Sequence, residues 1–121
     1  LFYANKPKII NEIIVCESAI DAISKMKLDK ENKNKNSGGR LYIATGGDFS
    51  DDVSYRIEAM AETHGAEIVA SFDNDEGGKK LTEKLPCDKK ETPNGSKDWN
   101  DVLKKRSEQS TEKEPTTGLS M

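Results

Sequence analysis

Short apolar runs alternate along this chain with stretches of helical periodicity, and this alternation constrains its fold more than any other feature. Strand-like runs cover residues 12–16, 41–44 and 66–72, and a helical pattern follows each of them. Strands that alternate with helices favour βαβ units and a mostly parallel sheet. We therefore predict an α/β fold with a mostly parallel sheet of three to four strands and helices on both faces.

The expected helices and edges follow from local signals. We expect helices over residues 18–27, 51–63, 78–85 and 99–106. On the first helix, Ala19, Ile20, Ile23 and Met26 share one apolar face. Residues 29–39 are polar and predict a loop, and residues 2–4 could form an extra edge strand. The stretch 87–96 is also polar, so a fourth parallel strand there is expected to be short or missing.

Acidic residues follow two of the strand-like runs directly. Glu17 comes after the first run, and Asp73 and Asp75 come after the third. The carboxyl ends of parallel strands share one edge of a sheet, where ligands bind, so these three acids are expected to converge. Carboxylates without a His or Cys cluster suit a hard cation such as Mg²⁺. For each acid taken singly, a helix cap or an ordinary loop position is an equally simple explanation.

Four segments carry a resemblance to a known family. Residues 15–22 hold a strand, Glu17, and Asp21 four residues later; residues 73–79 read Asp-Asn-Asp-Glu-Gly-Gly-Lys; residues 44–47 end in two glycines; and residues 97–103 begin Lys-Asp-Trp-Asn. Together they resemble the Toprim domain, closest to those of bacterial and plasmid-type DNA primases and primase-like mobilisation proteins. The resemblance covers roughly residues 10–105 and implies a Rossmann-like, Toprim-like fold.

The resemblance also implies a chemistry. Glu17, Asp73 and Asp75 would be the catalytic and metal-binding residues, with Mg²⁺ as cofactor and Mn²⁺ as a substitute. Residues expected to contact phosphate or to support the acids are Asp21, Gly46, Gly47, Lys79, Lys97 and Asp98. Four of them have a plain structural alternative: a cap for Asp21, a turn for the two glycines and a solvated helix face for Lys79. Trp99 is expected to anchor the last helix by packing.

The implied activity is nucleotidyl transfer that makes RNA primers on single-stranded DNA. Two alternatives stay open: phosphodiester cleavage, as in nucleases and topoisomerases with this domain, and a non-catalytic interaction module of a plasmid mobilisation protein. The net charge of −3 predicts weak binding to nucleic acid by this chain alone. We expect flanking domains to supply most contacts with single-stranded DNA and nucleotides, and the isolated module to be weakly active or inactive.

Composition sets the remaining expectations. A length of 121 residues suits one domain, expected over residues 1–106, with a polar, disordered tail over 107–121. The chain opens on Leu1, so we expect it to be part of a longer protein. No apolar run approaches the roughly 18 residues of a membrane span. Two cysteines without a disulfide pattern predict a reducing, cytoplasmic location, and the basic residues over 25–40 predict a solvated loop.

Overall fold

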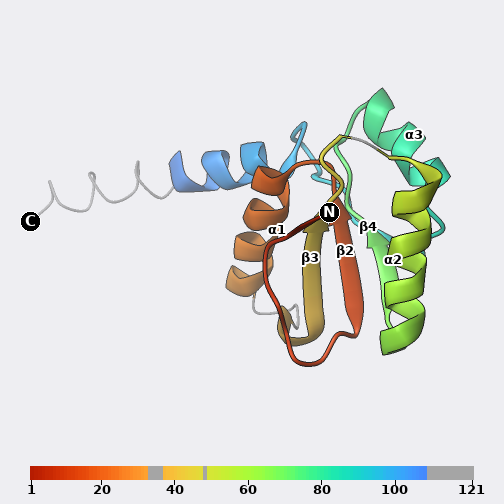
Figure 1. Cartoon of the computed structure of the whole chain (residues 1–121). Coiled ribbons are helices and arrows are strands. Elements are labelled where there is room, and N and C mark those ends of the chain that lie inside the picture. Colours follow the sequence, from red (N-terminus) through yellow and green to blue (C-terminus); the bar gives the residue numbers. More distant parts are fainter. Residues whose placement is uncertain (33–36, 48, 109–121) are drawn as a thin grey trace, which may run out of the picture.

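A five-stranded sheet forms the centre of the molecule in the computed structural model, which describes residues 1–32, 37–47 and 49–108 (Figure 1). Its strands are β1 (Phe2–Tyr3), β2 (Glu12–Cys16), β3 (Arg40–Ala44), β4 (Glu67–Ala70) and β5 (Lys89–Lys90), in the spatial order β1-β3-β2-β4-β5. The pairings of β2 with β3 and β4, and of β4 with β5, are parallel. Only β1 runs antiparallel to its neighbour.

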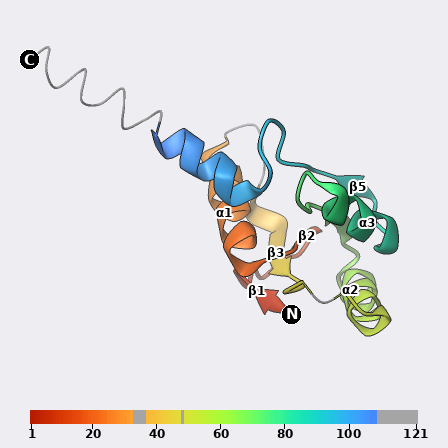
Figure 2. The ribbon, with the colours of Figure 1, turned by 90° about the horizontal axis from the view of Figure 1, so that it is seen from above.

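Helices cover both faces of this sheet, as Figure 2 shows from above. They are α1 (Ala19–Glu31), α2 (Asp51–His64), α3 (Glu76–Lys84) and a C-terminal helix over residues 99–108, with a short 3₁₀ turn at Ser37–Gly39. The core cluster on one face includes Ile57 and Ala61 of α2, and the cluster on the other includes Ala22 of α1 and Trp99. The predicted α/β fold is confirmed.

The central strands are buried on both faces, which explains why their sequences are continuously apolar. In β2, Ile13 and Val15 join the cluster under α2, while Ile14 and Cys16 join the cluster under α1. This division follows from the two-residue period of a strand. A parallel sheet covered by helices on both sides therefore needs no polar positions within its inner strands.

The face of α1 that packs on the sheet differs from the predicted one. Ile20 and Ile23 are 56% and 41% exposed, although the sequence analysis grouped them on the apolar face. The helix buries Ala22 and Leu28 together with polar residues instead, and it continues to Glu31. Apolar spacing failed here because the buried polar side chains of α1 have ionic partners on other elements.

Those partners form a buried ionic cluster, which corrects the prediction of a solvated loop for two of the basic residues over 25–40. Lys27 and Lys30 are exposed, and the basic residues at positions 33 and 35 lie outside the described residues. Lys25 and Arg40 have side chains only 3% exposed. The Arg40 guanidinium pairs with Asp29, with Glu12 at 3.2 Å and with Glu91 at 2.9 Å. Asp29 also accepts a hydrogen bond from the Tyr42 hydroxyl at 2.7 Å. Such pairing is what allows charges to be buried at all.

Both edges of the sheet are short strands. The expected edge strand at residues 2–4 is present as β1, and the expected short fourth parallel strand is present as β5. Beyond β1, the side chain of Asn5 continues the pairing along β3. Its Oδ1 accepts from the Tyr42 backbone N–H at 2.9 Å, and its Nδ2 donates to the Arg40 carbonyl at 2.9 Å.

Three further expectations concern the C-terminal tail, the two cysteines and membrane spans. The C-terminal helix includes residues 107 and 108, and the rest of the predicted tail lies outside the described residues. Cys16 and Cys87 are both free thiols. Within the described ranges, no helix combines the length and apolar character needed to cross a membrane.

Candidate metal centre

The carboxyl ends of β2, β3 and β4 meet at one edge of the sheet. Cys16 of β2 lies in register with Ala44 of β3, and Val15 with Ala70 of β4. The loops that follow remain joined, because the Gly46 N–H donates to the Glu17 carbonyl at 2.8 Å. The sheet thus brings Glu17 close to the loop that starts after β4, as expected for parallel strands.

Three aspartates form a compact group of carboxylates at this edge. One carboxylate oxygen each from Asp21, Asp73 and Asp98 lies within 4.8 Å of the other two. Asp21 is 5% exposed, and the other two are partly buried. The described residues offer no second group of this kind. An all-oxygen donor set at this spacing fits a hard divalent cation such as Mg²⁺ or Mn²⁺.

The membership of this group differs from the ligand set of the sequence analysis, which joined Asp73 with Glu17 and Asp75. The structure groups Asp73 with Asp21 and Asp98, which were assigned supporting roles. Glu17 also interacts with Asp73 through hydrogen bonding, so the predicted and observed sets overlap. A sequence signal existed for both Asp21 and Asp98. Asp21 lies in the first turn of the helix that follows Glu17, and Asp98 caps the last helix, so both belong to helix starts that face the same sheet edge.

Asp21 is held on both oxygens by its surroundings. Ser18, the N-cap of α1, donates its hydroxyl to Asp21 Oδ2 at 2.8 Å, and the Asn100 backbone N–H donates to Oδ1 at 3.2 Å. The Asp21 N–H in turn donates to Ser18 Oγ at 3.2 Å. The Ser-x-x-Asp capping pattern and the position in the carboxylate group therefore coexist in one residue.

Asp75 and Asp98 also cap helices. Asp75 Oδ1 accepts from the Gly78 N–H at 2.8 Å and begins α3, and Asp98 Oδ1 accepts from the Asp101 N–H at 2.8 Å and begins the C-terminal helix. A carboxylate has two oxygens, so a cap leaves one for a cation. For these residues, the capping explanation and the metal-binding explanation do not exclude each other.

Burial and the crowding of acidic groups raise the pKa of two carboxyl groups at the centre, Asp73 and Glu17. Burial, followed by the charges of Glu17, Asp21, Asp75 and Asp98, raises the pKa of Asp73 from its ordinary 3.8 to about 7. Burial is also the main cause that raises the pKa of Glu17; hydrogen bonding to Asp73 opposes the rise, and the charge of Asp75 adds to it. Like charges held this close favour either a shared proton or a cation.

Unsatisfied oxygens support the fit of a cation. Glu17 Oε1 and Asp73 Oδ1 are buried and accept no hydrogen bond from the described residues. The hydroxyls of Thr45 and Ser71, which follow β3 and β4, are likewise buried without a partner there. Sequence reasoning missed both hydroxyls, although each is a polar residue directly after an apolar strand. Buried polar atoms without partners are uncommon, and a bound ion with its waters is one way to satisfy them.

The glycines near the centre serve the backbone in two ways. A Cβ on Gly78 would lie 1.9 Å from the Asp73 carbonyl oxygen, so only glycine lets the first turn of α3 approach Asp73 this closely. Gly46 and Gly47 have φ angles of 77° and 83°, and a Cβ on either would meet no atom within 4 Å. A turn explains these two glycines, and their contact with phosphate stays a prediction.

The two candidate lysines lie at the rim. The Lys79 side chain is 70% exposed, and its Nζ lies 4.0 Å from Glu76 Oε1. The Lys97 side chain is exposed as well, and its carbonyl accepts from the Asn74 N–H at 2.7 Å. This bond holds the segment before Asp98 against the loop that carries Asp73. Binding of phosphate by either lysine stays a prediction.

Comparison with known protein families gives a match over most of the chain. A family model described as Toprim-like matches residues 14–103, a span that contains the three strand ends and all three aspartates of the centre. A search among curated proteins and a search among solved structures each returned no match.

Proposed function

Since this chain belongs to the Toprim-like family, we propose that it is a Mg²⁺-dependent nucleotidyl-transfer module of a primase-like replication or mobilisation protein. The observation that carries the proposal is the group of Asp21, Asp73 and Asp98, whose oxygens lie within 4.8 Å of one another at the ligand-binding edge of the sheet. The proposed product is an RNA primer made on single-stranded DNA.

In this proposal the three aspartates hold the cation, with Glu17 and Asp75 next to them. A bound divalent cation supplies charge neutralisation at the phosphoryl group and alignment of the reacting oxygens. Asp75 accepts the Gly78 N–H with one oxygen, and this bond orients the start of α3 against Asp73.

Glu17 is the residue proposed to handle the proton. Its pKa is raised by burial and by Asp75, and Oε1 is buried without a hydrogen-bond partner among the described residues. A carboxyl group with a raised pKa is a better proton acceptor than an ordinary one and can exchange a proton with a reacting hydroxyl. Glu17 is therefore assigned as general base or general acid, acting at Oε1.

Contact with nucleic acid is proposed to need more than this chain. The net charge of −3 gives little electrostatic attraction to a phosphate backbone, and the buried cations Lys25 and Arg40 are neutralised by ion pairs. Single-stranded DNA and nucleotides are the proposed partners, bound together with flanking domains. By itself the module is expected to bind the cation and to extend primers poorly.

The test is a template-directed extension assay on the longest protein that contains this sequence. The protein is incubated with single-stranded DNA, ribonucleotides and Mg²⁺, and we expect short RNA products that disappear in the Glu17→Gln and Asp73→Asn variants. Glu62→Gln, an exposed position on α2, is the matched control and should retain activity. Cleavage of the DNA with the same residue dependence would move the assignment to a nuclease. Absence of both activities would favour a non-catalytic interaction module.

A further inference from the structure

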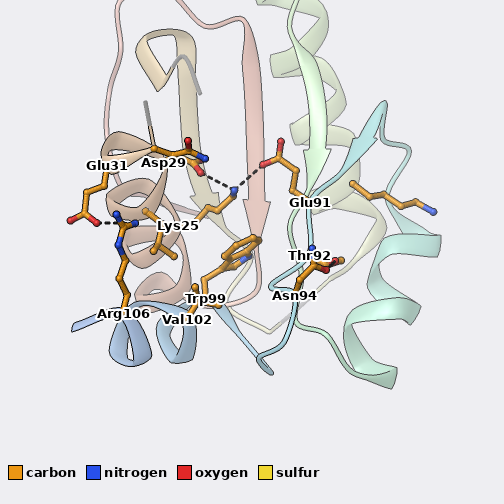
Figure 3. A pocket seen from close by; sticks show the side chains of 12 residues that line it. Lys25, Asp29, Glu31, Glu91, Thr92, Asn94, Trp99, Val102 and Arg106 are labelled. Carbon is orange, nitrogen blue, oxygen red and sulfur yellow. Dashed lines mark hydrogen bonds and ion pairs between the residues drawn. The ribbon is translucent and has the colours of Figure 1, made fainter. Parts of the chain in front are cut away.

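Lys25 is a buried cation that the proposed chemistry does not use. Its side chain is 3% exposed, and its Nζ lies 2.9 Å from Asp29 Oδ1 and 2.8 Å from Glu91 Oε1. Figure 3 shows this ammonium group between the two carboxylates, at the wall of a groove of about 680 Å³. Lys25 is also one helical turn after Asp21, on the same side of α1.

Trp99 lies directly against this cation. The Lys25 Nζ is 4.2 Å from the centroid of the indole ring, which places the charge over the ring face. The indole edge faces the sheet, where Nε1 donates to the Ser71 carbonyl at 2.9 Å. Trp99 is 8% exposed, so its ring is not available to stack on a base. The sequence expectation that it anchors the last helix by packing agrees with these contacts.

These contacts join the three segments that supply the aspartates of the metal centre. Lys25 is on the helix of Asp21, and Trp99 follows Asp98 in the chain. Ser71 is two residues before Asp73. One cation–π contact and one hydrogen bond therefore link α1, the C-terminal helix and the loop after β4 behind the carboxylates.

We propose that Lys25 and Trp99 are positioning residues that set the spacing of Asp21, Asp73 and Asp98 and thereby the affinity for the divalent cation. This inference rests on the proposed metal centre. Three like charges within 4.8 Å repel one another, so their backbones must be held by other contacts before a cation arrives. Residues behind a metal site that orient its ligands influence metal affinity strongly without touching the metal.

The first test measures Mn²⁺ affinity and thermal stability of Trp99→Phe in the 121-residue chain. Phenylalanine keeps an aromatic ring under Lys25 and removes the donor to Ser71. We expect Mn²⁺ binding, measured from the electron paramagnetic resonance signal of the free ion, to weaken on the order of 10-fold. Leu103→Ala is the matched control, since Leu103 packs against the same core cluster from the same helix. It should lower the melting temperature and leave Mn²⁺ affinity unchanged.

The second test uses Lys25→Met, which keeps the length of the side chain and removes its charge. We expect the same direction of change in Mn²⁺ affinity, and partial rescue by Lys25→Arg, which restores a cation over the ring. If Lys25→Met does not fold, Trp99→Phe decides the matter alone. Wild-type affinity in Trp99→Phe, or an equal loss in Leu103→Ala, would overturn the inference.

A further variant separates failure of this inference from failure of the proposed function. Asp73→Asn should abolish Mn²⁺ binding if the metal centre is correct. Binding that survives in Asp73→Asn would refute the centre itself. Loss in Asp73→Asn with full binding in Trp99→Phe would leave the centre standing and remove the positioning role. Trp99 is the single tryptophan of the chain, so a saturable change of its fluorescence on Mg²⁺ addition gives an independent readout.

Discussion

Replacement of Asp73 by asparagine should stabilise the metal-free domain at alkaline pH. Asp73 is partly buried and surrounded by the charges of Glu17, Asp21, Asp75 and Asp98, and both burial and these charges disfavour its ionisation. Asparagine has nearly the same shape and no charge, so it removes repulsion without opening a cavity. The expected sign is unusual, since most substitutions of half-buried residues destabilise a protein.

The magnitude follows from the shift in proton affinity. A pKa that rises from 3.8 to about 7 corresponds to at most ~4 kcal/mol between the ionised and neutral forms. Asp73 is only partly buried, and solvent screening reduces this to roughly 1–2 kcal/mol. In a domain of this size, each kcal/mol changes the melting temperature by about 4–8 °C.

The pH dependence has a definite direction. The folded domain binds the Asp73 proton more tightly than the unfolded chain does. The stability linked to this proton is therefore fully present below about pH 4 and is lost as the pH rises through about 7. The advantage of Asp73→Asn should accordingly be largest at pH 8 and should shrink as the pH is lowered to 4.5.

Thermal unfolding with a chelator present, followed by circular dichroism at pH 8 and pH 4.5, measures both effects. Asp52→Asn, at an exposed position of α2, controls for the loss of one charge. Addition of Mg²⁺ should then reverse the order at pH 8, because a cation at 100 times its dissociation constant stabilises only the wild type, by about 2.7 kcal/mol. An Asp73→Asn protein that melts below the wild type at pH 8 without metal would refute this reasoning.

Three further predictions concern the supports of the site. Gly78→Ala should destabilise the domain by more than about 3 kcal/mol in urea unfolding, because its Cβ would collide with the Asp73 carbonyl. Gly77→Ala is the control: the nearest atom to its Cβ lies at 3.4 Å, so it should be neutral or slightly stabilising. Asp75→Ala should cost about 1 kcal/mol through loss of the α3 cap, and Asp75→Asn much less, as measured by the same unfolding curves. Arg40→Met should lower the free energy of unfolding by about 3–5 kcal/mol, because it leaves buried carboxylates without their cation. A decrease of less than about 1 kcal/mol would show that these carboxylates are protonated or hydrated instead.

The sequence was informative wherever local periodicity and strand order decide the structure. Continuous apolar runs identified the inner strands, and the rule for parallel sheets placed Glu17 beside the loop after β4. The predicted helix ranges 18–27 and 51–63 begin and end, respectively, close to residues that act as caps in the structure, Ser18 before α1 and Gly65 after α2. These features depend on contacts within a few residues, or on the rule that the carboxyl ends of parallel strands share one edge of a sheet.

The features that sequence reasoning missed depend on partners far away in the chain. The buried face of α1 could not be read from its apolar residues, because Lys25 pairs with Glu91, 66 positions later. In the same way, the grouping of Asp21 with Asp73 and Asp98 depends on where the C-terminal helix docks. An isolated helix pattern contains no information about such docking, so charged residues were assigned to solvent by default.

The short strands at the two edges of the sheet have a consequence for solubility. β3 is a continuously buried strand, and an uncovered edge of this kind would be a template for pairing with a second molecule. β1 occupies part of that edge, and the amide of Asn5 occupies the backbone groups of Tyr42 and Arg40 beyond it. On the other side, the edge strand β5 is only two residues long and consists of Lys89 and Lys90, and lysine is a residue type that discourages pairing at a sheet edge. Short edge strands of this kind disfavour intermolecular β-pairing, which is the first step towards amyloid-like aggregates.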